Sequence, residues 1–233
     1  MAIIITGASR GLGKAIAEKF AAASQDLILC SRNEGGLSRV VEDLRHRYPE
    51  LTILGRSLDL AEGGQAKGFG QWILGLGVPV DILVNNAGLF IPGNVHSEEE
   101  GALEKMMGIN LYSAYHLTRT LMSKMIEQRK AHIFNICSIA SLQAYPNGGA
   151  YSISKFALAG FSKNLREEMK PFGIKVTSVY PGAVYTDSWA GSGVDPQRIM
   201  EAGDIADMVF AASQLSPQAT VEDILIRPQL GDL

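Results

Sequence analysis

Short apolar, β-rich runs alternate with longer stretches of helical spacing along the whole chain, and this alternation constrains the fold more than any other feature. Seven runs are typical of buried strands: Ala2–Thr6, Asp26–Cys30, Leu51–Leu54, Val80–Val84, His132–Cys137, Ile174–Tyr180 and Asp223–Ile226. The stretches between them favour helices over Gly11–Ser24, Gly35–Tyr48, Ala61–Leu76, Ser97–Lys130 with one break, Ala150–Pro171 and Gly203–Leu215. Apolar strands separated by helices form parallel sheets that are covered on both faces. The sequence therefore predicts an α/β fold, a Rossmann-type doubly wound sheet of seven parallel strands.

Length and composition narrow the class of protein further. The chain has 233 residues with no repeat, low-complexity tract or long linker, so we expect residues 1–233 to form one domain. Hydrophobic residues make up 46% and charged residues 19%, a balance that excludes an intrinsically disordered chain. A net charge of -3 provides no basic surface for nucleic acid or for an anionic membrane, so we expect neither as a partner.

The two cysteines and the N-terminus indicate a cellular location. Cys30 and Cys137 both lie inside apolar runs, which favours buried free thiols in a reducing compartment over a disulfide framework. The apolar stretch Ala2–Ile5 is far shorter than a signal peptide or a membrane span. We therefore expect a cytoplasmic protein.

A glycine-rich loop directly follows the first expected strand and precedes a helix. Its glycines have the spacing G-x-x-x-G-x-G, which differs from the commoner G-x-G-x-x-G. Glycines in this place let backbone N–H groups and the positive end of a helix approach a pyrophosphate closely. The alternative is a tight turn with close helix packing. We expect the loop to bind a dinucleotide through Gly7, Ser9, Arg10, Gly11, Leu12 and Gly13.

The end of the second expected strand discriminates between nicotinamide cofactors. An acidic residue about 20 positions after the glycines accepts hydrogen bonds from the ribose 2′-hydroxyl of NAD, whereas an arginine accommodates a 2′-phosphate. Arg32 stands 19 residues after Gly13, between Ser31 and Asn33. Arg10 could add a second positive charge, and the alternative is that Arg32 is an ordinary solvated side chain. The sequence predicts NADP(H) over NAD(H), with Ser31, Arg32 and Asn33 at the cofactor.

A tyrosine and a lysine one helical turn apart are the candidate acid-base pair. Tyr151 and Lys155 open the helical segment that follows the fifth strand, and residues four apart share one face of a helix. A free tyrosine has a pKa of about 10, which is too high for acid-base work at neutral pH. An adjacent ammonium and a positive nicotinamide ring both favour the phenolate, so we expect a lowered pKa for Tyr151.

The chain resembles the short-chain dehydrogenase/reductase family over nearly its whole length. The resemblance is carried by the glycine loop, the Tyr151 and Lys155 pair, Asn85-Asn86-Ala87-Gly88, Asn110, Ser138 and Pro181-Gly182. The resemblance implies that Tyr151 donates the proton to a carbonyl and that Lys155 holds the nicotinamide ribose. It also implies that Ser138 hydrogen-bonds the substrate oxygen, and that Asn110 interrupts its helix and holds a water of the proton relay. Taken singly, Asn110 could be a helix kink and Ser138 a strand-end turn hydroxyl.

The resemblance implies further cofactor contacts at strand ends: Asp59, Leu60, Asn86, Ala87, Gly88, Pro181, Gly182, Val184 and Thr186. In the family the loop after the sixth strand presents backbone to the carboxamide at the Val184 position and a hydroxyl at Thr186. Asp59 could instead cap the following helix, and the Asn86–Gly88 stretch could be a simple turn.

The substrate is less well defined by the sequence. A Ser- and Gly-rich segment, Asp187–Pro196, carries Trp189, which suits a mobile flap over an apolar substrate, although Trp189 could equally pack against its own domain. The C-terminal half looks like bacterial sepiapterin reductases, which implies a pterin side-chain carbonyl as substrate and Asp232 close to it.

These observations favour an NADPH-dependent oxidoreductase that reduces a carbonyl to an alcohol. The alternatives are a sepiapterin reductase specifically, a 3-oxoacyl-thioester reductase, and a dinucleotide sensor without turnover. The presence of Ser138, Tyr151 and Lys155 argues against the sensor.

The four histidines lack metal-ligand spacing, so no metal is expected. The run Ser97–Glu100 is interpreted as a helix N-cap with acidic residues on the helix dipole. In the family, the helices after the fourth and fifth strands pack on a neighbouring subunit, which implies a homodimer or homotetramer.

Overall fold

The computed structural model describes residues 1–186 and 193–231, and its strands form one seven-stranded sheet. The strands are β1 (Ala2–Thr6), β2 (Asp26–Ser31), β3 (Ile53–Ser57), β4 (Ile82–Asn85), β5 (Ala131–Ile136), β6 (Ile174–Pro181) and β7 (Asp223–Ile226). Their order is β3-β2-β1-β4-β5-β6-β7, and every neighbouring pair is parallel. The predicted Rossmann-type doubly wound sheet is confirmed.

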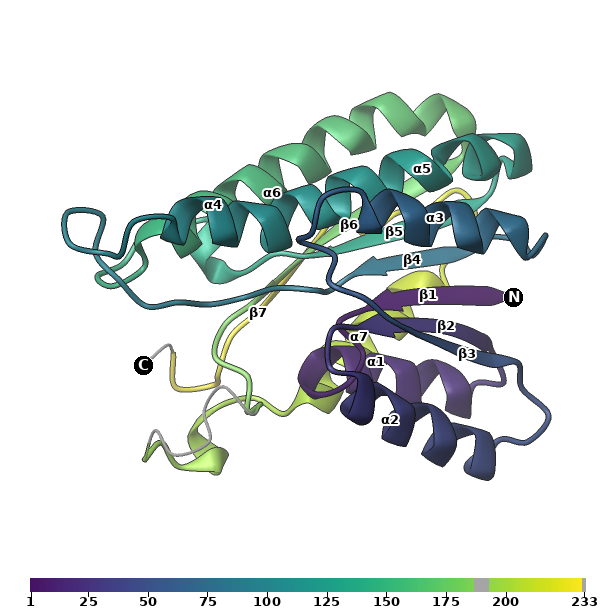
Figure 1. The fold of residues 1–233 in the computed structure, drawn as a ribbon, viewed down its shortest axis with the longest axis horizontal. Coiled ribbons are helices and arrows are strands. Elements are labelled where there is room, and N and C mark those ends of the chain that lie inside the picture. Colours follow the sequence, from purple (N-terminus) through teal and green to yellow (C-terminus); the bar gives the residue numbers. More distant parts are fainter. Residues whose placement is uncertain (187–192, 232–233) are drawn as a thin grey trace.

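Helices cover both faces of this sheet (Figure 1). One face carries α1 (Gly11–Ala22), α2 (Glu34–Arg47) and α7 (Ala202–Ser213). The other carries α3 (Gln65–Gly75), α5 (Ser113–Gln128) and α6 (Gly149–Met169), with the short α4 (Ala102–Met107) beside the start of α6. Single turns of 3₁₀ helix span Ile139–Ser141, Lys170–Phe172 and Pro196–Arg198.

The alternation of side chains along the central strand explains why both faces are covered. Ile3 and Ile5 on β1 pack into the apolar cluster under α1, α2 and α7, whereas Ile4 packs into the cluster under α3, α5 and α6. All three isoleucines are fully buried. A strand that is apolar on both faces needs helices on both faces to exclude water from it, which is what the uninterrupted apolar run predicted.

Three elements depart by more than two residues from the sequence-based expectation: β3, the helix expected from Ser97, and α3, which begins at Gln65 and not at Ala61. β3 runs from Ile53 to Ser57, later than Leu51–Leu54, because its register is set by pairing with β2, from Leu27↔Ile53 to Ser31↔Ser57. As the edge strand it tolerates the polar, exposed residues at its end. The helix expected from Ser97 begins only at Ala102 and is interrupted by a π-helical turn at Gly108–Tyr112, after which α5 continues.

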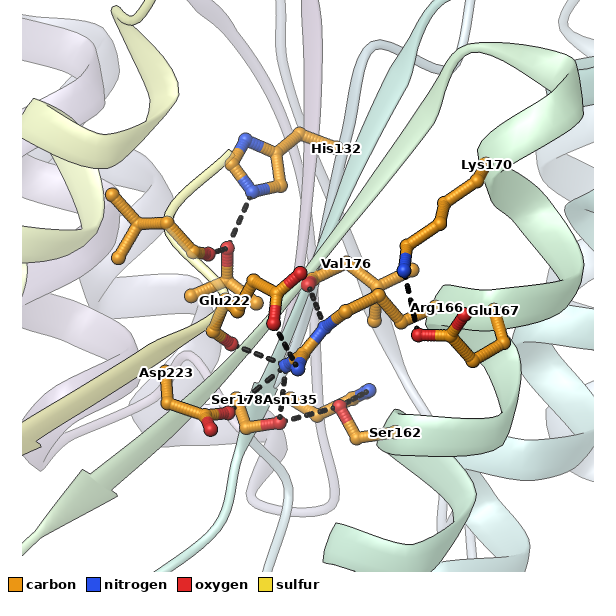
Figure 2. Close-up of polar contacts among 12 residues, drawn as sticks. His132, Asn135, Ser162, Arg166, Glu167, Lys170, Val176, Ser178, Glu222 and Asp223 are labelled. Carbon is orange, nitrogen blue, oxygen red and sulfur yellow. Dashed lines mark hydrogen bonds and ion pairs between the residues drawn. The ribbon is translucent and has the colours of Figure 1, made fainter. Parts of the chain in front are cut away.

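A buried arginine fastens the C-terminal strand to helix α6. Arg166 on α6 is 6% exposed, and its Nε donates to the carbonyl oxygen of Val176 at 3.0 Å. Its Nη2 donates to the Ser178 hydroxyl at 3.2 Å, to the Asp223 carboxylate at 2.9 Å and to the Glu222 carbonyl. Figure 2 shows the guanidinium surrounded by these oxygens. Arg166 therefore links β6 and β7 to the helix that carries Tyr151 and Lys155.

A chain of buried polar side chains continues from this arginine across the sheet. Ser178 Oγ donates to Ser162 Oγ at 2.8 Å, and Asn135 Nδ2 donates to the same oxygen at 3.0 Å (Figure 2). Asn85 Nδ2 then donates to Asn135 Oδ1 at 2.8 Å. This network crosses β4, β5 and β6 and ends one residue before Asn86, at the carboxyl end of β4.

Buried titratable side chains carry shifted pKa values. Cys30 and Cys137 are free and buried, and burial raises the pKa of each thiol to about 12. Burial lowers the pKa of His132 to about 3, so its ring is neutral and contacts Thr177 Oγ1 at 2.7 Å.

Of the helices in the described part of the chain, none has the length and apolar character needed to cross a membrane.

Candidate active site

The predicted site residues that the structure describes lie at the carboxyl ends of the strands or on the helices that follow them. The glycine loop joins β1 to α1, and a left-handed backbone at Gly7 (φ +67°) turns the chain there. A Cβ on Gly13 would collide with the Gly7 carbonyl oxygen and lie 2.5 Å from Asn86 Nδ2. Only glycine therefore lets α1 start so close to the end of β1.

Asn86 holds this loop against the end of β4. Its side-chain Nδ2 donates to the carbonyl oxygens of Thr6 and Gly7 at 2.8 and 3.2 Å. In return, the Thr6 hydroxyl accepts hydrogen bonds from the backbone N–H groups of Asn86 and Ala87, both at 2.9 Å. The stretch from Asn86 to Gly88 is thus more than a turn, because it fixes the edge of the loop that we expect to hold a pyrophosphate.

The end of β2 brings hydroxyl and guanidinium groups beside the glycine loop. Ser31 Oγ donates to Ser9 Oγ at 2.7 Å, and the Asn33 side chain caps α2 by accepting from Gly36 N at 2.9 Å. Arg32 is exposed, and its Nη1 forms an ion pair with Asp59 Oδ2 at 3.2 Å. An open pocket of about 360 Å³ adjoins this region and is lined by Ser9, Lys14, Gly36, Arg39, Val40 and Asp43.

Asp59 and Leu60 are placed differently from each other. Asp59 does not cap α3, which begins at Gln65 after Gly64; its Oδ1 instead accepts from Ala61 N at 3.0 Å. The Leu60 side chain is 6% exposed and belongs to the apolar core. Only the backbone of Leu60 is therefore placed to meet a cofactor.

Ser138, Tyr151 and Lys155 converge beyond the end of β5. Ser138 directly precedes the turn Ile139–Ser141, where its Oγ accepts from Ala140 N at 3.1 Å and its N–H donates to Ser141 Oγ at 3.2 Å. These bonds fix the hydroxyl, which lies close enough to the phenol of Tyr151 to act against the rise of its pKa. Ser138 is therefore both a turn hydroxyl and a partner of Tyr151.

Lys155 lies over the ring of Tyr151, with its ammonium 5.8 Å from the ring centroid. The ammonium donates to the carbonyl oxygen of Ile136 at 2.8 Å, at the end of β5. Phe90, in the loop after β4, packs edge-to-face against the Tyr151 ring, with ring centroids 4.9 Å apart. The two candidate acid-base residues therefore share one face of α6, as their spacing predicts.

The pKa of Tyr151 is shifted in the direction opposite to the expected one. Burial raises it above its usual value, and the hydrogen bond with Ser138 opposes the rise only in part. Burial also lowers the pKa of Lys155 to about 8. The chain's own groups thus keep Tyr151 as a neutral phenol near neutral pH, because the effect of burial on its pKa outweighs that of the Ser138 hydroxyl. A phenol in this form holds a proton that it can donate.

Asn110 ties helix α6 to the loop after β4. It sits in the π-helical turn and is 1% exposed. Its Oδ1 accepts from Leu89 N at 2.7 Å, and its Nδ2 donates to Leu89 O at 3.0 Å and to Ser154 Oγ at 2.8 Å. Ser154 in turn donates to the Tyr151 carbonyl at 2.7 Å. Sequence reasoning missed Ser154, although a serine one turn after Tyr151 in a largely apolar helix was a usable signal.

Backbone hydrogen bonds hold the loop after β6 in place. Gly182 N donates to Ile226 O at 2.8 Å, and Val184 pairs with Met200 in an isolated bridge. The Val184 side chain is buried in the core, so its backbone is the part that can face the carboxamide. Gly11 approaches this loop closely, because a Cβ there would lie 3.2 Å from Thr186 Cγ2. Pro181, at the end of β6, completes the edge.

The last predictions concern the two substrate residues, a metal site and the dinucleotide. Trp189 and Asp232 lie outside the described residues. Within residues 1–186 and 193–231, no cluster of three or more His, Cys, Asp or Glu side chains could hold a metal ion. A dinucleotide, which the fold class implies, fits the described residues, because the glycine loop is only partly buried at Gly7, Ser9 and Gly11 and lies next to the Ser31 hydroxyl at the end of β2.

Sequence comparison with family models gives a clear result. Residues 1–196 match the model described as short chain dehydrogenase, which is more than half of the chain. The chain belongs to the short-chain dehydrogenase family. Membership makes it an oxidoreductase of the short-chain type and agrees with the Rossmann-type sheet and with the strand-end motifs from which the family resemblance was inferred.

Two relatives illustrate the breadth of the similarity. The sepiapterin reductase of Chlorobaculum tepidum is 30% identical over 239 residues, covering 99% of this chain and 97% of that protein. Dehydrogenase/reductase SDR family member 7B of Xenopus laevis is 35% identical over 189 residues, covering 79% of this chain but 58% of that protein.

Solved structures share the whole architecture. A metagenomic short-chain oxidoreductase in complex with NADP has a TM-score of 0.85 and 28% identity, covering 98% of this chain and 97% of its own. An alcohol dehydrogenase from Thermococcus sibiricus, complexed with 5-hydroxy-NADP, has a TM-score of 0.89 and 24% identity, covering 98% and 96% of the two chains. The latter similarity concerns the fold alone.

Proposed function

We propose that this short-chain dehydrogenase is an NADPH-dependent carbonyl reductase in which Tyr151 is the general acid. The observation that carries the proposal is the convergence of Ser138, Tyr151 and Lys155 at one strand end, where Lys155 lies close to Gly88 in the loop after β4. Backbone hydrogen bonds fix the side chains of Ser138 and Lys155, and the Tyr151 ring lies under the Lys155 ammonium. A purely structural site would not need this arrangement.

Each residue has a defined task in carbonyl reduction. NADPH, when bound, supplies the hydride that reaches the carbonyl carbon. The Tyr151 phenol donates its proton to the carbonyl oxygen, where negative charge develops as the hydride arrives. The Ser138 hydroxyl hydrogen-bonds the same oxygen, and Lys155 orients the ribose while its charge stabilises the phenolate that Tyr151 becomes. We propose that Asn110 holds a water of the proton relay, as the family resemblance implies.

The cofactor preference follows from charge at the end of β2. We propose that Arg10 and Arg32 bind the 2′-phosphate of NADP(H), with Ser9, Ser31 and Asn33 beside the ribose. The ion pair between Arg32 and Asp59 is largely exposed, and exposed pairs contribute little free energy, so a phosphate can replace the carboxylate. The metagenomic short-chain oxidoreductase in complex with NADP, which is 28% identical to this chain, supports this choice.

The remaining predicted contacts follow the same edge of the sheet. The glycine loop and Asn86, Ala87 and Gly88 would hold the phosphates and the adenosine side. Asp59 and the Leu60 backbone would lie at the adenine. The loop from Pro181 to Thr186 would contact the carboxamide with its backbone and the Thr186 hydroxyl.

Two classes of carbonyl compound compete as the proposed substrate. The C. tepidum relative favours a pterin side-chain carbonyl, and a 3-oxoacyl thioester is the competing class. The test is NADPH oxidation with a panel that contains both classes and a simple aryl ketone, with product alcohols identified by mass spectrometry. We expect reduction of at least one panel member. NADPH binding without any turnover would instead favour a dinucleotide sensor.

We also propose that the protein is a homodimer or homotetramer formed through α5 and α6, which lie side by side on one face (Figure 1). Large apolar side chains remain exposed there: Ile153 is 44% and Phe156 45% exposed on α6, and Tyr112 beside the start of α5 is 50% exposed. Light scattering should give a multiple of the 25.1 kDa chain, and Phe156→Glu should lower it.

A further inference from the structure

The loop after β4 is fastened to the segment that leads into helix α6. Gly93 N donates to the carbonyl oxygen of Asn147 at 3.1 Å. The side chain of Asn94 donates to Asn147 Oδ1 and accepts from Asn147 N, both at 3.0 Å. We call these paired segments, residues 93–98 and 147–150, the clasp. The clasp joins two loops that are more than fifty residues apart in the sequence, and its second segment ends directly before Tyr151.

A carboxylate completes the clasp. Glu98 Oε2 accepts a hydrogen bond from the backbone N–H of Ala150 at 3.1 Å. Ala150 is the second residue of α6, and the backbone N–H groups of a helix's first turn have no partner within the helix. The N-cap residue is Gly148, which has no side chain to supply, and the first turn of α6 carries no acidic residue. Glu98 therefore caps α6 from another loop.

Two glycines let the segment before Tyr151 pack closely against the Glu98 carboxylate. A Cβ on Gly149 would lie 2.6 Å from Glu98 Oε2 and 2.5 Å from the Gly93 carbonyl oxygen. A Cβ on Gly148 would lie 2.5 Å from Ser152 Oγ, and Asn147 has a left-handed backbone with φ +61°. The sequence Asn147-Gly148-Gly149 thus allows a close approach that other residues would prevent.

We propose that Glu98 is a positioning residue for Tyr151, acting as the hydrogen-bond acceptor that fixes the first turn of α6. Tyr151 is the third residue of that helix and follows Ala150 directly. A first turn without its cap frays, and fraying would move the phenol relative to Ser138, which is held independently by its own turn. The inference rests on the proposed function, because it assigns Glu98 a part in the proton transfer by Tyr151.

The test compares Glu98→Ala and Glu98→Gln with Glu99→Ala and Glu100→Ala, two controls that remove neighbouring exposed carboxylates. A small displacement of a reacting group can cost up to about 100-fold in rate. We expect Glu98→Ala to lower kcat about 10-fold or more, with the KM for the carbonyl and the Kd for NADPH within about 2-fold of the unmutated protein. Glu98→Gln retains an acceptor oxygen, so its kcat should stay near that of the controls. If Glu98→Ala does not fold, Glu98→Asp, which is one methylene shorter, replaces it.

Amide hydrogen exchange gives a readout that needs no substrate. The N–H of Ala150 should exchange faster in Glu98→Ala than in Glu98→Gln or in the controls. Equal kcat values for Glu98→Ala and Glu99→Ala, unchanged exchange at Ala150, or an equal loss of kcat in Glu98→Gln would each overturn the assignment. If the unmutated protein reduces no carbonyl, the proposed function fails, whereas exchange at Ala150 still decides whether Glu98 caps α6.

Discussion

The guanidinium of Arg32 forms an ion pair with the carboxylate of Asp59, with Nη1 3.2 Å from Oδ2, at the edge of the sheet where the adenosine end of a dinucleotide is expected. Arg32 follows β2 and Asp59 follows β3, so the pair spans two neighbouring strand ends. The Arg32 side chain is 72% exposed and that of Asp59 23%. A ligand phosphate would therefore compete with Asp59 for a guanidinium that is still accessible.

This competition predicts opposite effects for the two partners. Arg32→Asp should weaken NADPH binding by about 10-fold or more and weaken NADH binding little, because a charged contact to the 2′-phosphate becomes a repulsion. Asp59→Asn should strengthen NADPH binding a few-fold, because it releases Arg32 and removes a like charge from the phosphate. Fluorescence titrations with both dinucleotides measure this. An unchanged preference in Arg32→Asp would rule out the assignment.

Close packing at Gly13 predicts a loss of both stability and cofactor binding. Gly13→Ala places a methyl group against the Gly7 carbonyl oxygen, so we expect a loss of about 1–3 kcal/mol in the free energy of unfolding and weaker NADPH binding. Gly68→Ala on α3 meets no atom within 4 Å and should stabilise the protein by about 0.5–1 kcal/mol. Denaturant titration of both variants decides the point, and equal stabilities would contradict it.

Burial of Lys155 predicts a specific pH dependence of stability. Its pKa is lowered from the usual 10.5 to about 8 in the folded protein. Between these pH values the unfolded chain retains a proton that the folded chain has released, so the contribution of Lys155 to stability rises with pH. From pH 7 to pH 10, the unmutated protein should gain on the order of 2–3 kcal/mol relative to Lys155→Met. Parallel unfolding curves for the two proteins at every pH would show that Lys155 titrates normally.

The contacts of Arg166 predict that it is more important for stability than a surface cation of the same helix. Arg166→Met leaves buried oxygens of β6 without donors, and we expect a loss of roughly 2–4 kcal/mol in the free energy of unfolding. Lys163→Met, at an exposed position on α6, serves as the control and should change stability by less than about 0.5 kcal/mol. A similar small change in both variants would mean that the C-terminal strand does not depend on Arg166.

The sheet could be predicted from the sequence because each strand is a short apolar run that must be buried on both faces. Ile3, Ile4 and Ile5 indicate this most clearly, since the two sides of β1 need separate cores. The edge strand was harder: Arg56 and Ser57 carry no apolar signal, and only backbone pairing with β2 places them in β3. Local sequence therefore predicts a strand poorly where its residues are polar, whereas β7, at the other edge of the sheet, has the bounds that its sequence predicted.

For the candidate site, the sequence predicted which residues lie together but not what they contact. The spacing of Tyr151 and Lys155 and the order of the strand-end motifs were visible in the sequence, because helix geometry and parallel topology bring them together. The partners of these residues were not visible. Glu98 was interpreted as belonging to its own helix, yet it bonds to Ala150, 52 residues later. Likewise, the direction of the pKa shift of Tyr151 depends on its burial, which spacing alone does not reveal.

Replacing Tyr151 with phenylalanine tests the proposed donation of a proton by the Tyr151 phenol during NADPH-dependent reduction. This change removes one hydroxyl and preserves the ring that packs against Phe90. With a carbonyl that the unmutated protein reduces, we expect kcat to fall by about 10²–10⁴-fold in Tyr151→Phe while the Kd for NADPH stays within about 2-fold. A variant that binds NADPH and turns over the carbonyl at the unmutated rate would contradict it.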